Sequence, residues 1–136
     1  MSDSTLSILL ITEDETLHER CVREFRARFN LEVHRYQNTY VKETLRVFRP
    51  AAVIWDGRRL PPRWVALVAW MREHFPKRPV IALLDGENEE VSRELHRLGV
   101  TAQLDAGSDS FFETLQMHLF AVVLDCERHR REPAPG

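Results

Sequence analysis

Five short apolar runs along the chain have the pattern of β-strands. Residues 6–12, 51–55 and 80–84 are largely apolar, and residues 51–55 run directly into Asp56 and Gly57. A short apolar run closed by a turn residue is typical of a strand buried on both faces, as in a parallel sheet between two helix layers. Residues 31–36 alternate apolar and polar positions, as an edge strand does, and residues 101–104 form a short fifth run.

The segments between these runs have the period of amphipathic helices. Leu17, Cys21 and Phe25 recur every four residues in a predicted helix over residues 15–29, which Asp14 would cap. Four more helices are predicted over residues 39–48, 63–75, 87–98 and 109–128. Strands that alternate with helices through short connections predict right-handed crossovers and a parallel sheet. This length and rhythm predict an α/β protein with the flavodoxin-like (βα)5 doubly wound fold and strand order 2-1-3-4-5.

Composition and charge narrow the class of protein. The 136 residues are 43% hydrophobic and 29% charged, which is typical of a globular domain, predicted here over residues 1–128. Residues 129–136 are interpreted as a tail or the start of an inter-domain linker. The net charge of −2 gives no electrostatic reason to expect direct nucleic-acid binding, and no apolar run has the length to span a membrane. The first residues lack the basic start of a secretory signal, and Cys21 and Cys126 have no metal or redox spacing, so we expect a cytoplasmic protein with free thiols.

Acidic residues follow two of the predicted strands. Glu13 and Asp14 come after the first strand, and Asp56 comes after the third. If these strands are neighbours, the three carboxylates meet at the carboxyl edge of the sheet, where ligands bind in such folds. Carboxylates that close raise one another's pKa or recruit a hard cation, so Glu13, Asp14 and Asp56 could hold Mg²⁺, with Asp56 the most buried. The alternative is that each acid ends its strand in solvent.

Familiar enzyme sites are not indicated. A nucleotide site needs a glycine- or hydroxyl-rich loop after the first strand, whereas the acidic loop found there would repel phosphate. A P-loop is absent from the sequence, and the histidines lie within predicted helices or on the edge strand, where no Ser-His-Asp arrangement can be argued. We therefore expect a protein that is not an enzyme and that requires no cofactor, with Mg²⁺ as the one candidate.

The acidic pair and the third-strand aspartate resemble those of the receiver domains of bacterial two-component response regulators. The resemblance covers about residues 6–126. It implies that Glu13 and Asp14 match a metal-binding pair, and that Asp56 matches the residue that accepts phosphate from a histidine kinase. The other positions of the family's pattern differ. Leu84 stands where the family has a serine or threonine, Gln103 where it has a switch aromatic, and Ala106 where it has a lysine.

These differences remove the groups that respond to phosphorylation. In the resembled family a hydroxyl and an ammonium make contacts that only the phosphoryl group offers, and a ligand shifts an equilibrium only by its differential affinity for the two states. Arg58 or Arg59 could replace the lysine charge, because a guanidinium binds phosphate well; the interpretation as solvated loop arginines is favoured. We therefore predict an atypical receiver, or pseudo-receiver, that acts as a protein-interaction and dimerisation module in a bacterial regulator.

Two alternatives stay open from the sequence. The first is a Mg²⁺-dependent receiver that a histidine kinase phosphorylates on Asp56, with an unorthodox conformational response. The second is a flavodoxin-like domain that binds a small molecule. For a receiver or a pseudo-receiver, an output domain in the same chain is a further candidate partner.

The predicted last helix carries more large apolar residues than one buried stripe needs. Its buried stripe is assigned to Phe112, Leu115, Leu119, Val122 and Cys126, which leaves Phe111, Met117, Phe120 and Leu124 as a predicted interface. A two-fold homodimer is the commonest oligomer, and in the resembled family the fourth helix, fifth strand and fifth helix form the usual dimer face. The helix over residues 63–75, with Trp64, Leu67 and Trp70, is the competing surface.

Overall fold

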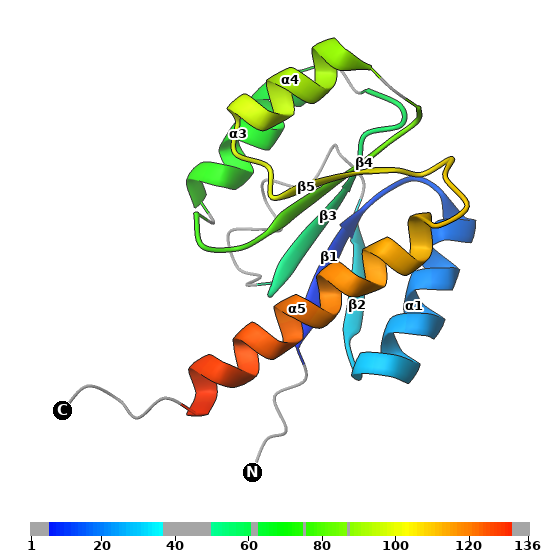
Figure 1. The fold of residues 1–136 in the computed structure, drawn as a ribbon, viewed down its shortest axis with the longest axis vertical. Helices are drawn as coiled ribbons and strands as arrows, with labels where there is room; N and C mark the ends of the chain where they lie inside the picture. The colour runs from blue at the N-terminus through cyan, green and yellow to red at the C-terminus, as the bar shows by residue number, and fades with distance from the viewer. Residues whose placement is uncertain (1–5, 37–49, 61–62, 75, 87, 132–136) are drawn as a thin grey trace, which may run out of the picture.

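The computed structural model describes residues 6–36, 50–60, 63–74, 76–86 and 88–131, and it forms one five-stranded parallel sheet (Figure 1). The strands lie in the order β2-β1-β3-β4-β5, and every pairing is parallel. Their bounds are Ser7–Ile11 (β1), Glu32–Tyr36 (β2), Ala52–Asp56 (β3), Val80–Leu84 (β4) and Ala102–Asp105 (β5). The predicted doubly wound α/β fold and its strand order are confirmed.

Helices cover both faces of the sheet. Those described are Glu15–Phe29 (α1), Trp64–His74 (α3), Glu89–Arg97 (α4) and Phe111–Arg131 (α5). Figure 1 shows α1 and α5 on one face and α3 and α4 on the other. The helix predicted over residues 39–48 lies outside the described residues. None of the helices that the structure describes is long and apolar enough to cross a membrane.

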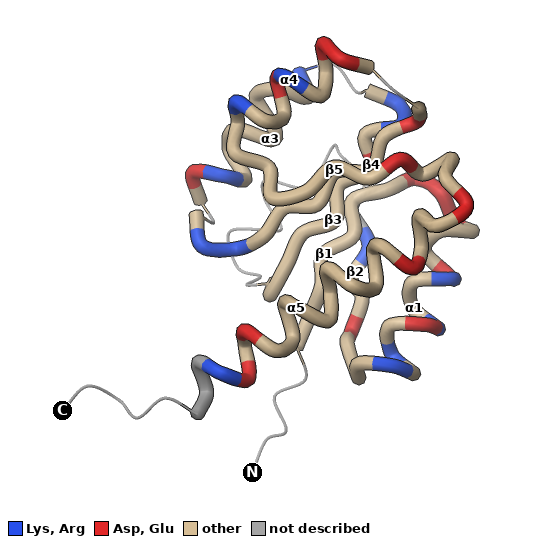
Figure 2. The backbone as a smooth tube through the Cα atoms, viewed as in Figure 1, with Lys and Arg blue, Asp and Glu red and all other residues tan. Residues whose placement is uncertain are grey.

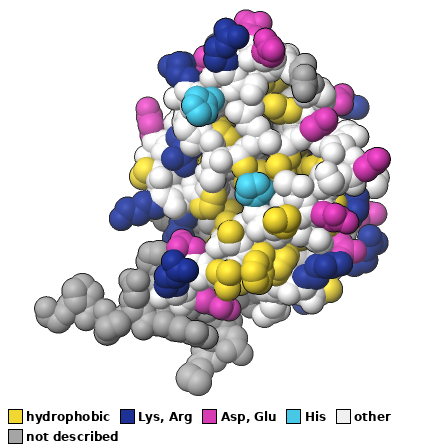
Figure 3. All heavy atoms as spheres, viewed as in Figure 1, with side chains coloured by type: hydrophobic (Ala, Val, Ile, Leu, Met, Phe, Trp, Pro, Cys, Tyr) yellow, Lys and Arg dark blue, Asp and Glu magenta, His cyan; other side chains and the backbone are white. Residues whose placement is uncertain are grey.

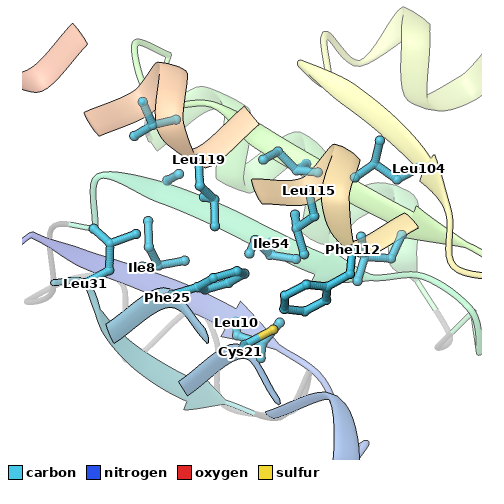
Figure 4. Packing of buried hydrophobic residues seen from close by; sticks show 14 of the residues in the cluster. Ile8, Leu10, Cys21, Phe25, Leu31, Ile54, Leu104, Phe112, Leu115 and Leu119 are labelled. Carbon is cyan, nitrogen blue, oxygen red and sulfur yellow. The ribbon is translucent and has the colours of Figure 1, made fainter. Parts of the chain in front are cut away.

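Two apolar cores form between these layers because side chains on a strand alternate between its faces. Ile8 and Leu10 of β1 belong to the core under α1 and α5, whereas Leu9 and Ile11 belong to the core under α3 and α4. In the first core the rings of Phe25 and Phe112 stack with centroids 5.5 Å apart, which joins α1 to α5 (Figure 4). Strands β1, β3 and β4 are therefore buried from both sides, as their continuous apolar runs predict.

Two predictions about exposed apolar residues are corrected by the packing. Phe111 was predicted to be part of the exposed interface, but it is only 9% exposed and meets Phe112 edge to face. It is the first residue of α5, where the helix starts against the core, so its ring lies in that core. Leu67 of α3 is likewise buried. Met117, Phe120 and Leu124 are exposed as predicted, at 72%, 53% and 45%; their role as an interface stays a prediction.

The turn from β1 into α1 is fixed by a helix cap. The side chain of Asp14 accepts hydrogen bonds from the backbone N–H groups of Thr16 and Leu17, at 2.9 and 3.1 Å. This contact satisfies donors that the first turn of a helix leaves without partners. Capping also anchors Asp14 directly beyond the carboxyl end of β1, which is where the candidate site lies.

Candidate functional site

The predicted acidic residues line one cavity at the carboxyl edge of the sheet. Strands β1 and β3 are hydrogen-bonded neighbours, with Ile11 opposite Trp55, so the residues that follow them lie side by side. The cavity has a volume of about 540 Å³ and is lined by Glu13, Asp14, Glu15, Asp56, Arg58, Arg59 and Asp85. The side chain of Asp56 is 10% exposed and that of Asp14 is 36% exposed, while Glu13 is an exposed residue. Asp56 is thus the most buried of the three acids, as predicted.

Arg58 bridges two of the carboxylates of this cavity, those of Asp14 and Asp56, by direct hydrogen bonds. Its Nη2 donates to Oδ2 of Asp14 at 2.9 Å and to Oδ2 of Asp56 at 2.8 Å. Its Nε donates to Oδ1 of Asp56 at 2.9 Å, and its backbone N–H donates to the same oxygen at 3.1 Å. The guanidinium therefore grips Asp56 with two nitrogens, the geometry in which arginine binds carboxylates most strongly. The favoured interpretation of Arg58 as a solvated loop residue is wrong; Arg59, by contrast, is exposed.

Thr12 is a site residue that the sequence analysis missed. It is 1% exposed, and its Oγ1 donates to Oδ2 of Asp56 at 2.6 Å while accepting from the backbone N–H of Asp14 at 3.0 Å. One hydroxyl thus ties the end of β1 to the end of β3. The available signal was a hydroxyl residue that closes an apolar strand directly before an acidic pair.

These contacts decide the charge of the site. Burial by itself would raise the pKa of Asp56, but the hydrogen bonds from Arg58 and Thr12 outweigh it and hold that pKa below its ordinary value. The pKa of Asp14 is also lowered, first by the backbone N–H of Leu17 and then by Arg58. Hydrogen bonding to Asp56 raises the pKa of Arg58, so its charge is secure. At neutral pH Asp14 and Asp56 are therefore both ionised, with the Arg58 cation between them.

The predicted three-carboxylate metal set is not assembled in this arrangement. Within the described part of the chain, no three His, Cys, Asp or Glu side chains are placed to hold a metal ion. The reason is visible in the contacts: Arg58 lies between Asp14 and Asp56 and uses the oxygens that a cation would need. The donor chemistry of Glu13, Asp14 and Asp56 suits Mg²⁺, but the position of Arg58 does not.

The loop that carries Arg58 packs on an aromatic pair. Trp55 is fully buried, and its ring stacks on that of Trp64 with centroids 5.8 Å apart. Gly57 sits over this ring and donates its N–H to the carbonyl of Leu83 at 2.8 Å. A Cβ at position 57 would lie 2.5 Å from the Trp55 ring, so the loop can take this course only with glycine there. The path of the loop brings the Arg58 backbone N–H within reach of Asp56.

The three positions at which the sequence departs from the receiver pattern lie on β4, on β5 and directly after β5. Leu84 is buried at the end of β4. Gln103 on β5 donates from Nε2 to the carbonyl of Ser92 at 3.0 Å, which ties β5 to α4. Ala106 donates its backbone N–H to the carbonyl of Leu84 at 2.8 Å and packs against the core. None of these three side chains carries a hydroxyl or a positive charge that could meet a phosphoryl group.

Comparison with known proteins adds a fold-level relationship. No protein-family model matches the sequence, and the comparison with curated proteins returns no match. Solved structures do match: a protein described as a response regulator from Chloroflexus aurantiacus superposes with a TM-score of 0.74 at 16% identity, over 89% of this chain and 99% of that one. This chain has the fold of response-regulator receiver domains. The likeness extends to the chemotaxis protein CheY4 of Vibrio cholerae, with a TM-score of 0.72 at 17% identity, over 88% of this chain and 99% of that one.

A larger regulator shares the receiver fold over part of its length. The response regulator RcsB of Salmonella typhimurium matches with a TM-score of 0.73 at 14% identity, over 87% of this chain and 61% of that one. At such identities the likeness establishes the fold, and the chemistry has to be argued from the site itself.

Proposed function

We propose that this protein is an atypical receiver domain, a pseudo-receiver, that serves as a protein-interaction and dimerisation module in a bacterial regulator. It works without the standard phosphorylation switch and is not an enzyme. The observation that carries this proposal is the set of hydrogen bonds from Arg58 to both Asp14 and Asp56. An arginine of the chain stands where a receiver would need a metal ion and a free carboxylate.

Asp56 is a poor phosphoacceptor in this setting because both of its oxygens are engaged. Oδ2 accepts from Thr12 and Arg58, and Oδ1 accepts from two nitrogens of Arg58. Attack on a phosphoryl donor would require an oxygen to leave these charge-assisted bonds, which are about twice as strong as neutral ones. Bound Mg²⁺ would also have to displace the guanidinium from Asp14, and two cations in one small cavity repel each other.

A phosphoryl group on Asp56 would find few side chains whose position it could change. Leu84 and Ala106 cannot donate a hydrogen bond from their side chains, and the Gln103 amide already bonds the Ser92 carbonyl on α4. A switch needs contacts that one state makes and the other does not. The residues at these positions offer none, which supports an interaction module that stays in one conformation.

The proposed function and its alternative imply three candidate partners. A second copy of the chain is the first partner, through the exposed residues of α5. A histidine kinase belongs to the alternative in which Asp56 is phosphorylated. An output domain in the same chain is the remaining candidate, because the similar RcsB chain is larger than the region matched and its structure is described in terms of DNA interaction.

The proposal is tested by adding Mg²⁺ and beryllofluoride while following tryptophan fluorescence. Trp55 adjoins Asp56 and is fully buried, so a ligand on Asp56 should alter its emission. We expect no saturable change in the wild type, and no difference from the Asp56→Asn variant. We also expect no stable acyl phosphate from acetyl phosphate. Labelling of the wild type that disappears in Asp56→Asn would replace this proposal with the phosphorylated receiver.

The phosphorylated receiver is the second candidate because one observation favours it. Asp56, Asp14 and Glu13 line a single cavity that opens to solvent, so small phosphodonors can reach it. Arg58 could then neutralise an incoming phosphoryl group, since guanidinium binds phosphate as well as carboxylate. The Mg²⁺ and beryllofluoride experiment distinguishes the two candidates directly.

A further inference from the structure

Helix α5 carries a continuous stripe of exposed residues along its outer face. Its members are all exposed residues, and they are Glu113, Met117, Phe120, Ala121, Leu124 and Arg128. At 3.6 residues per turn they fall within roughly 100° of the helix circumference. The buried residues Phe112, Leu115, Leu119 and Val122 lie on the opposite side, against the sheet. The stripe is thus a face of its own and not the margin of the core.

The stripe is apolar in the middle and charged at both ends. From Thr114 to Leu124 the helix has no lysine, arginine, aspartate or glutamate, as Figure 2 shows by the tan stretch of α5. Figure 3 shows hydrophobic side chains gathered on the molecular face over which α5 runs. The ring of Phe120 is steadied by Phe29 of α1, with centroids 6.3 Å apart. Large apolar side chains exposed together in this way mark an interaction site.

The spacing of the residues in the stripe is the same when it is read from either end. The intervals between its six members are four, three, one, three and four residues. Two identical helices that pair antiparallel about a two-fold axis between Phe120 and Ala121 would therefore match at every position. Met117 would meet Leu124 of the second copy, and Phe120 would meet Ala121 of the second copy, a large side chain against a small one. Glu113 would meet Arg128 of the second copy at both ends.

We propose that α5 pairs antiparallel with α5 of a second copy of this chain, in the register that places Glu113 opposite Arg128 of that copy. This rests on the proposed function as a dimerisation module and specifies how the dimer forms. Opposite charges favour the antiparallel direction, because a parallel pair would set Glu113 against Glu113 and Arg128 against Arg128. A closed two-fold contact of this kind uses one surface on both subunits.

The competing surface on α3 has fewer apolar side chains free of contacts within the subunit. The ring of Trp64 is engaged with Trp55, and that of Trp70 stacks on His74 with centroids 4.0 Å apart. Both tryptophans are partly buried within their own subunit. The α5 stripe is one helix wide and about 22 Å long from Glu113 to Arg128, at about 1.5 Å per residue. Such a contact lies at the small end of specific interfaces, so the dimer should form reversibly.

Charge exchange tests the direction and the register together. Sedimentation velocity over a concentration series should show a reversible wild-type dimer. Glu113→Arg alone and Arg128→Glu alone should each weaken association more than about tenfold, because like charges then face each other at both ends. An equal mixture of the two single variants, and the double variant Glu113→Arg/Arg128→Glu, should both regain dimerisation. The single variants decide the direction, since in a parallel pairing each reversal would only replace one like-charge pair by another and leave association unchanged, and recovery in the double variant then confirms the register.

Three further variants, Phe120→Glu, Glu90→Arg and Trp70→Glu, test the interpretation. Phe120→Glu should abolish the dimer, and Glu90→Arg, an exposed charge reversal on α4, should leave it intact. Circular dichroism of each variant checks that the domain is folded. A wild type that stays monomeric overturns both this pairing and dimerisation as part of the proposed function, while the beryllofluoride result stands by itself. A wild-type dimer that the single reversals do not weaken, or that Trp70→Glu alone dissociates, overturns the α5 pairing and keeps dimerisation.

Discussion

At the scale of single residues, Arg58 decides the chemistry of the site. A carboxylate as buried as that of Asp56 would ordinarily hold its proton more tightly, or recruit a cation from solution. Here the cation belongs to the same loop, two residues along the chain, and is delivered with two nitrogens on one carboxylate. Breaking such a pair from one side leaves a buried charge without compensation, which costs more than the pair itself contributes.

Replacing Arg58 by alanine should raise the pKa of Asp56. Burial of the carboxylate remains in this variant, but the hydrogen bonds that outweigh it are lost. Because the folded pKa of Asp56 is depressed in the wild type, its ionisation stabilises the fold above the unfolded pKa of about 3.9, and this stabilisation is lost as the pH falls through the folded pKa. The stability difference between wild type and Arg58→Ala should therefore be largest near neutral pH and shrink in acid.

Carbon-detected NMR titration of the aspartate side chains measures the pKa of Asp56. Urea unfolding at several pH values measures the stability difference between the wild type and Arg58→Ala. Arg59→Ala is the matched control, because Arg59 is the exposed neighbour in the same loop. An Asp56 pKa that stays low in Arg58→Ala would show that Thr12 alone sustains the charge, and would remove Arg58 from the centre of the site.

At the scale of elements, the loop after β3 is where one small residue controls the site. Gly57→Ala should destabilise the domain by about 1–3 kcal/mol, since the added methyl would overlap the Trp55 ring and a packed core yields only at a cost. The variant should also shift the fluorescence of the buried Trp55. Gly107→Ala is the control, because its added methyl would meet no ring and only the carboxylate oxygens of two exposed residues, Asp105 at 3.3 Å and Asp85 at 3.9 Å. Equal unfolding midpoints for Gly57→Ala and the wild type would contradict the close packing of this loop.

The sequence predicted the elements well because burial leaves a periodic pattern. Continuous apolar runs gave β1, β3 and β4, the alternating run gave the edge strand β2, and the acids after two strands predicted the edge at which the site lies. The contacts of Arg58 could not be predicted in this way. They depend on the path of a non-periodic loop over the Trp55 ring, and a loop arginine with no regular spacing looks solvated by default.

The misplacement of Phe111 has a different physical cause. A helical period assigns residues to faces only once the helix has begun, and the predicted start at residue 109 preceded the observed start at Phe111. In the first turn the side chain can still reach the core at the carboxyl edge, and Phe111 does so. Met117, Phe120 and Leu124 lie further along the helix, where the period holds, and their exposure follows the prediction.

At the scale of the whole molecule, the acidic site and the exposed α5 stripe occupy separate regions. The site lies at the carboxyl edge of the sheet, between the ends of β1 and β3, whereas α5 runs back from that edge along one face (Figure 1). Of the three positions that differ from the receiver pattern, Leu84 and Gln103 face the α3 and α4 side of the sheet, and only Ala106 packs on the side that α5 covers. Energetic coupling between two sites requires an element with two arrangements that both sites bias. We predict that Leu84, Gln103 and Ala106 provide no such element.

Self-association should therefore be independent of the ligands that activate phosphorylated receivers. We expect the same wild-type dimer dissociation constant in sedimentation velocity without additives, with Mg²⁺, and with Mg²⁺ and beryllofluoride, and the same constant again for Asp56→Asn. Coupling is reciprocal, so a ligand that tightened the dimer would itself bind more tightly to the dimer than to the monomer. A dimer that beryllofluoride strengthens in the wild type but not in Asp56→Asn would show that the carboxyl edge does communicate with α5. The hydrogen bonds of Arg58 would then hold Asp56 only in the unphosphorylated state, and phosphorylation would break them. This follows because the carboxyl-edge site and α5 could be coupled only through a rearrangement that frees Asp56.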